Sequence, residues 1–265
     1  MKYLKTILTI LVFSLIFFSC TEDEDNDEND YSVAITNCLP SNLQNNIIAY
    51  YPFGAGSVKD ESGNNRHLTN ASSAVSINDR NGNGNCAYEF DTTDSFTLTN
   101  ATFLNNLPQI SISVWFQSAD TNGGNFELLI GMENANGLHC PDTFGDFSLS
   151  LYDCNRPVFG YEEKSIWGHW NSSWTSCNDS VTYYNANWHH LVATFDTGTL
   201  KIYVDGILTA ESQNGPCGPT MLNIGDLKIG GYYKGKIDDI IIYDIPLNQT
   251  QVSDLFQTTP CCVET

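Results

Sequence analysis

Apolar and polar residues alternate over short stretches of this chain, with turn-forming residues between the stretches. The clearest example is Gln109–Phe116, in which Ile110, Ile112, Val114 and Phe116 occupy every second position. Side chains at every second position of a strand point to the same face of its sheet. This period of two therefore predicts a strand that buries one face in a core.

The same pattern predicts an all-β domain. Asp205-Gly206 is a two-residue hairpin signal, and only Pro246–Phe256 has a helical pattern, as a short C-terminal helix. Many short strands at short spacing indicate an antiparallel two-sheet jelly-roll sandwich, without an internal repeat or a second domain. Besides 109–116, we expect strands at 47–53, 87–91, 95–99, 126–132, 146–152, 188–196, 200–204, 207–211, 227–230 and 236–243.

The N-terminus has the pattern of an export signal. Lys2 and Lys5 precede the apolar run Ile7–Phe18, which is too short to span a bilayer comfortably, and Ser19 and Cys20 follow it. A cysteine at this place resembles a bacterial lipobox, in which the cysteine is lipidated. We therefore expect a signal peptide at residues 1–19 and a lipid anchor on Cys20. The alternative is cleavage elsewhere, with Cys20 discarded.

Seven carboxylates lie between Glu22 and Asp30, directly after that cysteine. Their mutual repulsion opposes folding, so residues 20–45 are expected to form a lipidated, acidic tether. The stretch resembles the acidic surface-export signal of Bacteroidetes lipoproteins. This resemblance implies an outer-membrane lipoprotein that is displayed on the cell surface, whereas a solvated spacer is the plainer interpretation.

Composition narrows the classes of partner. The chain has 31 acidic residues against 11 Lys and Arg, a formal net charge of -20. Phosphate binding needs clustered basic residues, so nucleic acid and nucleotides are not expected as ligands. A charge of this sign suits a secreted protein and leaves carboxylates for hard cations.

The cysteines also indicate export. With Cys20 assigned to lipid, an even number remains, and no pair has the spacing of a zinc ribbon. Disulfides persist outside the cytoplasm. Cys38 is expected to join Cys261 or Cys262 in the C-terminal tail, residues 258–265, so that the two vicinal cysteines have different partners. The predicted disulfide cysteines are Cys38, Cys86, Cys140, Cys154, Cys177, Cys217, Cys261 and Cys262.

Five motifs, in order, resemble concanavalin A-like domains of the laminin-G type. They are Ile48–Leu68, Ile112–Phe116, Trp188–Asp196, Ile202–Gly206 and Gly235–Leu247. The resemblance covers residues 46–257, nearly the whole folded part. It implies two curved antiparallel sheets and the binding of carbohydrate or protein without catalysis. It does not identify the ligand, because one fold hosts many functions.

A calcium site is the best-supported chemistry. Asp60, Ser62 and Asn64 crowd oxygen donors into one turn, and calcium prefers six to eight oxygens. The resemblance pairs this turn with Asp238 and Asp239 of the closing strand. Neighbours in a strand point to opposite faces, so only one of the two is expected to be a side-chain ligand. The alternative is an Asx turn capped by Asp60, without metal.

The expected ligand surface lies between Cys140 and Cys177, which has no strand period. Its aromatic residues suit the C–H faces of sugars, and the alternative is a satellite core beneath a long insertion. The candidate residues are Tyr161, Trp167, Trp170 and Trp174.

Catalysis is not expected. Glycoside hydrolases of the same fold need two carboxylates flanking a cleft, and the strand motif that supplies them is missing. Asp79–Gly84 fits the opening of an EF-hand loop, but Phe90 stands where a glutamate is required, so an ordinary loop is expected. The sequence thus predicts a binding protein for extracellular glycan, with a protein-binding adhesin or scaffold as the alternative and a hydrolase as the less favoured one.

Overall fold

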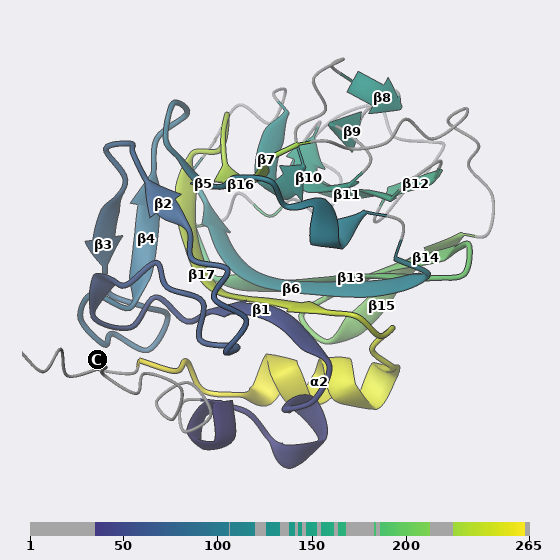
Figure 1. Cartoon of the computed structure of the whole chain (residues 1–265), viewed down its shortest axis with the longest axis horizontal. Helices are drawn as coiled ribbons and strands as arrows, with labels where there is room; N and C mark the ends of the chain where they lie inside the picture. Colours follow the sequence, from purple (N-terminus) through teal and green to yellow (C-terminus); the bar gives the residue numbers. More distant parts are fainter. Residues whose placement is uncertain are drawn as a thin grey trace, which may run out of the picture.

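In the computed structural model, the alternating strands pair into two large antiparallel sheets that face each other (Figure 1). The structure describes residues 35–105, 107–119, 126–132, 138–140, 143–144, 147–152, 155–161, 164–167, 183, 186–212 and 225–262. The predicted jelly-roll sandwich is confirmed. No helix in these residues is long and apolar enough to cross a membrane.

The first sheet has the order β15-β14-β13-β6-β17-β4-β3, and β1 pairs with β17 outside this path. Its strands are β1 (Ile47–Tyr51), β3 (Val75–Ile77), β4 (Ala87–Phe90), β6 (Gln109–Ser118), β13 (His189–Asp196), β14 (Thr199–Val204), β15 (Ile207–Ser212) and β17 (Gly235–Tyr243). The pairing of β1 with β17 places the first and last strands side by side, as the resemblance implied.

The second sheet has the order β12-β11-β10-β7-β16-β5-β2. Its strands are β2 (Thr69–Asn70), β5 (Ser95–Leu98), β7 (Glu127–Met132), β10 (Phe147–Tyr152), β11 (Arg156–Tyr161), β12 (Lys164–Trp167) and β16 (Leu227–Gly230). A small third sheet pairs β8 (Leu138–Cys140) with β9 (Thr143–Phe144). Short 3-10 turns are η2 (Ser41–Leu43), η3 (Gly54–Gly56) and η4 (Thr102–Leu104).

The main core lies between the two sheets. Ile112, Val114 and Phe116 of β6 are fully buried there, together with residues such as Leu191 of β13 and Ile229 of β16. The period of two thus assigns the inward face of β6 correctly. Burial of these aliphatic and aromatic side chains supplies the main stabilisation of the sandwich.

The outward face of the first sheet is partly buried as well, because α2 (Gln249–Gln257) packs on it (Figure 1). The helix begins at Asn248, whose side chain accepts the N–H groups of Thr250 and Gln251 in a capping box. Val252 and Leu255 then pack with residues of the first sheet in a second hydrophobic cluster. The predicted C-terminal helix is therefore confirmed.

Candidate functional site

The Asp60 turn is held together by a buried carboxylate. Asp60 Oδ1 accepts the backbone N–H groups of Tyr50 and Ser62, each at 2.9 Å, and Oδ2 accepts that of Arg66 at 3.0 Å. Hydrogen bonds from backbone N–H groups stabilise an ionised carboxylate without a metal. This geometry matches the Asx-turn alternative that the sequence left open.

The other predicted donors of the turn face a backbone carbonyl. Ser62 Oγ, Asn64 Nδ2 and Arg66 Nη1 all donate to the oxygen of Ile48, at 3.3, 3.0 and 2.6 Å. The Arg66 guanidinium also lies 3.8 Å above the ring centre of Phe103. An arginine cation thus occupies the neighbourhood in which calcium would need oxygen ligands, so the turn in this arrangement does not fit the ion.

Asp238 and Asp239 are bound by an arginine from a distant loop. Arg80 Nη1 donates to Asp238 Oδ2 and to Asp239 Oδ2, each at 2.7 Å. The register of β17 against β6 shifts between Asp238 and Ile241, and Asp239 has a φ of 40°. This β-bulge turns both carboxylates toward one guanidinium. The expectation that the two side chains point to opposite faces is therefore wrong.

Burial controls the electrostatics around Arg80. Loss of solvation raises the pKa of Asp238, and the charge of Asp239 raises it further, while Arg80 opposes both effects. The Arg80 guanidinium lies 4.2 Å above the ring centre of Trp115, and this ring stacks on His190 and Phe256. A cavity of about 10 Å³ beside Arg80 and His190 has room for about one water.

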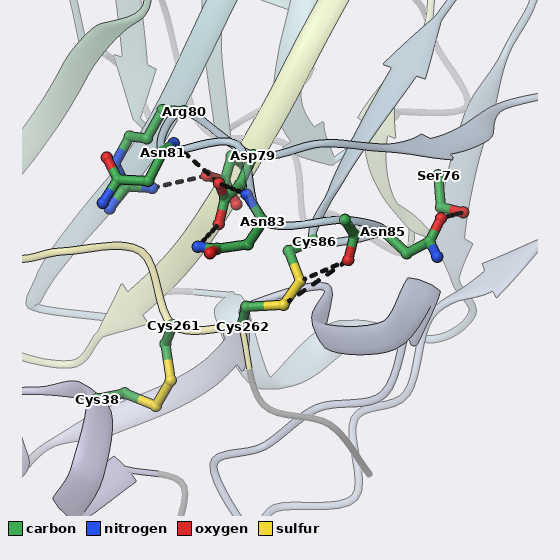
Figure 2. The surroundings of a disulfide bond; sticks show 12 residues. Cys38, Ser76, Asp79, Arg80, Asn81, Asn83, Asn85, Cys86, Cys261 and Cys262 are labelled. Atoms are coloured by element: carbon green, nitrogen blue, oxygen red, sulfur yellow. Dashed lines mark hydrogen bonds and ion pairs between the residues drawn. A yellow bond between two sulfur atoms is a disulfide. The ribbon is translucent and has the colours of Figure 1, made fainter.

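The loop that carries Arg80 is fixed at both ends. Asp79 Oδ1 accepts the N–H groups of Asn81 and Asn83, which closes the turn (Figure 2). Cys86, at the other end, forms a disulfide with Cys262. The interpretation of Asp79–Gly84 as a loop without an EF-hand is consistent with this geometry. The sequence did not reveal the role of Arg80, because its acidic partners are about 160 positions away.

The predicted calcium ligands thus form two groups. Asp60, Ser62 and Asn64 share one turn, whereas Asp238 and Asp239 each accept a hydrogen bond from Arg80. In the described part of the chain, no group of three or more His, Cys, Asp and Glu side chains is placed to hold a metal ion. Calcium binding stays a prediction from the sequence.

The predicted aromatic ligand surface has a different fate at each residue. Tyr161 is 2% exposed and packs in the main core, where its hydroxyl contacts the carbonyls of Leu104 and Leu107. Its assignment to a ligand surface is therefore wrong. Trp167 ends β12. Trp170 and Trp174 lie outside the described residues.

Another aromatic residue is exposed at the turn between β16 and β17. Tyr232 is 58% exposed, and it has a φ of 59°, in the left-handed region that favours glycine. Its N–H donates to the carbonyl of Thr92 at 2.9 Å, and the N–H of Gly231 donates to the carbonyl of Asp94 at 2.9 Å. The β16–β17 turn is thereby joined to the turn between β4 and β5.

The β4–β5 turn is itself fixed by a buried carboxylate. Asp94 accepts the N–H and the hydroxyl of Ser73 at 2.9 and 2.7 Å, and the N–H of Asp91 at 2.8 Å. Burial raises the pKa of Asp94, but these hydrogen bonds outweigh that effect and lower the pKa below its usual value. Asp91, Thr92 and Thr93 are exposed on this turn.

Tyr232 was not predicted from the sequence. The signal that could have found it is the run Gly230-Gly231-Tyr232-Tyr233 between two strands. Paired glycines predict a turn, and the two tyrosines follow in the segment between β16 and β17. Tyr233 is fully buried, which leaves Tyr232 outside.

Comparison with known families gives one match over more than half of the chain. The model of the concanavalin A-like lectin/glucanases superfamily, laminin-G type, matches residues 90–253. A comparison with curated protein sequences gives no significant match.

Several solved structures share the fold. The receptor-binding domain of botulinum neurotoxin type G is 18% identical, with a TM-score of 0.59, over 80% of this chain and 51% of that one. The binding domain of Paraclostridial mosquitocidal protein 1 is 17% identical, with a TM-score of 0.62, over 81% and 52%. A structure of botulinum neurotoxin type C, whose cell entry depends on two ganglioside molecules, is 16% identical, with a TM-score of 0.61, over 81% and 51%. This chain thus spans about half the length of these domains, and the likeness concerns the fold.

Proposed function

Because this chain belongs to the concanavalin A-like lectin/glucanases superfamily, we propose that it is a non-catalytic surface lipoprotein that binds extracellular carbohydrate. The superfamily includes both sugar-binding and sugar-cleaving proteins, as its name states. The choice between the two depends on what the carboxylates of the domain do.

The observation that carries the binding role is the use of buried carboxylates as structural groups. Asp60, Asp79 and Asp94 accept hydrogen bonds within their own turns, and Asp238 and Asp239 are bound to Arg80. A glycoside hydrolase needs one carboxylic acid and one carboxylate free to reach the sugar from either side of the bond. Groups that hold turns and an arginine are unsuited to that task.

Two disulfides support an extracellular location. Cys38 pairs with Cys261, and Cys86 pairs with Cys262. Such bonds persist in oxidising compartments. Together with the lipobox-like Cys20 and the acidic Glu22–Asp30, they favour a lipid anchor in the outer membrane and display on the cell exterior.

A protein partner is the second candidate, and one surface feature favours it. Ile207 and Leu208 are 67% and 39% exposed, and Phe256 of α2 is 36% exposed. A Cβ on Gly206 would lie 3.2 Å from the Phe256 ring, so the hairpin and the helix end are adjacent. Adjacent exposed apolar residues are a feature of protein–protein contact sites.

An array of immobilised polysaccharides and glycoproteins tests the proposal. We expect the detergent-solubilised, full-length protein to bind at least one polysaccharide. The chain length of that polysaccharide should be unchanged after prolonged incubation with the protein, because no cleavage is expected. Binding to glycoproteins that survives enzymatic removal of their glycans would instead favour the protein partner. Duplicate arrays in calcium and in EDTA test the calcium prediction at the same time.

A further inference from the structure

We propose that Tyr232 is the stacking platform of a binding site for an uncharged sugar, formed where the β16–β17 turn meets the β4–β5 turn. This inference rests on the proposed carbohydrate-binding function and assigns its site and ligand class. Isolated exposed apolar residues are common on protein surfaces, so exposure alone does not carry the assignment.

The first step is the conformation of Tyr232. A bulky residue in the left-handed region is strained, and glycine adopts the φ of 59° found at Tyr232 more easily. Strained residues persist where the surroundings fix them, and they gather at ligand sites. Here the strained residue carries an aromatic ring that lies outside the sandwich, although glycine would adopt this backbone conformation at a lower cost.

The second step is the rigidity of the backbone on both sides of Tyr232. Before it, Gly231 accepts the N–H of Leu128 at 3.1 Å. After it, the Tyr233 hydroxyl donates to the carbonyl of Lys236 at 3.0 Å, and the Lys234 N–H donates to Glu127 Oε1 at 3.0 Å. A platform that is already fixed loses little conformational entropy when a ligand binds.

The third step is the chemistry of the residues that the two turns expose. Thr92 holds the N–H of Tyr232 through its carbonyl, and Asp91, Thr92, Thr93 and Lys234 are exposed. The two turns thus combine an aromatic face with hydroxyl, carboxylate and ammonium groups. An apolar ring suits the C–H face of a pyranose, and polar groups of both hydrogen-bonding kinds suit its hydroxyls.

The fourth step concerns the charge of the ligand. Asp91 and Lys234 carry opposite charges on the two turns. The chain as a whole has a net charge of -20, which repels anionic polymers at long range. We therefore assign an uncharged sugar, and not a uronate or a sulfated glycan.

The experiment measures binding of full-length protein to two sets of immobilised polysaccharides. Dextran, xylan and galactomannan are the uncharged set, and polygalacturonate and chondroitin sulfate are the anionic set. The variants are Tyr232→Ala, Tyr232→Gly and Tyr232→Phe. Val75→Ala is the matched control, because Val75 is 55% exposed on β3.

The wild type and the control are expected to bind an uncharged polysaccharide with equal affinity. Tyr232→Ala and Tyr232→Gly should each weaken binding about tenfold or more, while Tyr232→Phe keeps the ring and changes affinity less than about threefold. Tyr232→Gly should also melt at or above the wild-type temperature, because it relieves the left-handed strain. Loss of affinity without loss of stability distinguishes a ligand contact from a structural residue.

Three results would overturn the assignment. They differ in whether they also contradict the ligand class or the proposed carbohydrate-binding function. Unchanged binding by Tyr232→Ala would place the sugar site elsewhere and leave the proposed function standing. Preferential binding to the anionic set, lost in the same variants, would overturn the ligand class. No binding by the wild type to either set, or to any glycan on the wider array, would remove the proposed function and the site with it.

Discussion

Two arginines lie beside the residues that the sequence predicted as calcium ligands. Arg66 donates to the carbonyl of Ile48 beside the Asp60 turn, and Arg80 binds Asp238 and Asp239 on β17. At the scale of single residues, the Arg80 guanidinium thus binds one oxygen of each of two carboxylates that were expected as calcium ligands. The side chain of Arg80 is only 7% exposed, so water does little to stabilise its charge. The buried guanidinium and its buried carboxylate partners therefore stabilise one another.

Removal of the Arg80 charge should be costly. In Arg80→Met, two buried carboxylates lose their cation, and such a loss destabilises proteins by about 3–5 kcal/mol. Lys201→Met is the control, because the Lys201–Glu211 pair is partly exposed and 3.6 Å long, and such pairs contribute about 0–1 kcal/mol. Urea unfolding of both variants measures the difference. Equal, small losses would contradict a structural role for the buried cluster.

His190 should make the domain sensitive to acid. Burial lowers the pKa of His190 from 6.5 to about 3, helped by the charge of Arg80. Between these values the unfolded chain binds a proton that the folded chain does not, so stability is lost as the pH falls from 6.5 toward 3. We expect the free energy of unfolding to fall less steeply over this window in His190→Gln.

The glutamine variant keeps a polar contact for Ser113, whose hydroxyl lies 2.8 Å from His190 Nε2. Asp238 and Asp239 have raised pKa values, which give stability that is lost as the pH rises, and both remain in the variant. The difference between the two proteins therefore isolates the histidine. Parallel pH profiles would show that His190 does not titrate in this way.

Substitution of Asp60 can distinguish the stability that comes from its hydrogen bonds from any stability that comes from bound calcium. Asp60→Ala leaves three backbone N–H groups without their acceptor, and we expect a loss of about 3 kcal/mol in calcium-free buffer. Ser57→Ala serves as the control, because its hydroxyl accepts one exposed N–H. A melting temperature that falls on chelation in the wild type but not in Asp60→Ala would show that calcium does bind this turn.

At the scale of elements, strands with a clean period of two were predictable and irregular ones were not. The pattern of Ile110, Ile112, Val114 and Phe116 gave the inward face of β6. By contrast, β11 (Arg156–Tyr161) contains a proline and a glycine, so its residues did not indicate a strand, and Tyr161 was assigned to the wrong surface. Local patterns do not carry the tertiary contacts that decide such segments.

The bulge at Asp239 marks a second limit of the sequence. The positive φ of Asp239 cannot be predicted from the residues next to it in the sequence. It is stabilised by Arg80, which lies 158 and 159 positions from its two partners. The candidate sugar site has the same character, because Tyr232 and Thr92 meet only through the fold. Geometry that depends on distant partners therefore had to come from the structure.

The N-terminal cap of α2 allows a test of one element. Asn248 accepts the N–H groups of Thr250 and Gln251 at 3.0 and 3.1 Å. We expect Asn248→Ala to cost about 1 kcal/mol in thermal unfolding, as is typical for a lost cap. Thr250→Ala, two positions further on, removes an exposed side chain and keeps the capped N–H, so it should have little effect. Equal effects of both substitutions would mean that the cap does not set the stability of the helix.

At the scale of the whole molecule, the two ends of the described chain are joined. The disulfide Cys38–Cys261 links residues 223 positions apart, and Cys86–Cys262 links the C-terminal tail to the Arg80 loop (Figure 2). The expectation that Cys38 pairs with one of the two vicinal cysteines is confirmed. The remaining predicted cysteines, Cys140, Cys154, Cys177 and Cys217, stay predictions.

Loss of either bond should destabilise the domain. The paired substitution Cys38→Ser with Cys261→Ser is expected to cost about 2–5 kcal/mol, as for other native disulfides in exported domains. Cys86→Ser with Cys262→Ser should have a similar effect and should also loosen the tail around Arg80. Thermal unfolding and peptide mapping without reduction check both statements. Recovery of Cys38 in a peptide linked to Cys262 would contradict the pairing.

The two disulfides of the adjacent cysteines Cys261 and Cys262 also determine how the domain carries mechanical load. Tension that enters upstream of Cys38, as from a surface anchor, meets a short covalent route through Cys261 and Cys262 to Cys86. The longer segment between residues 39 and 85, which includes β1 and β3, then bears no tension, because the disulfides bypass it. A strand that bears no tension is not peeled from its sheet, so forced unfolding cannot begin at β1. With the proposed surface anchor, a pull on the anchor would therefore leave the first strands of the domain without load.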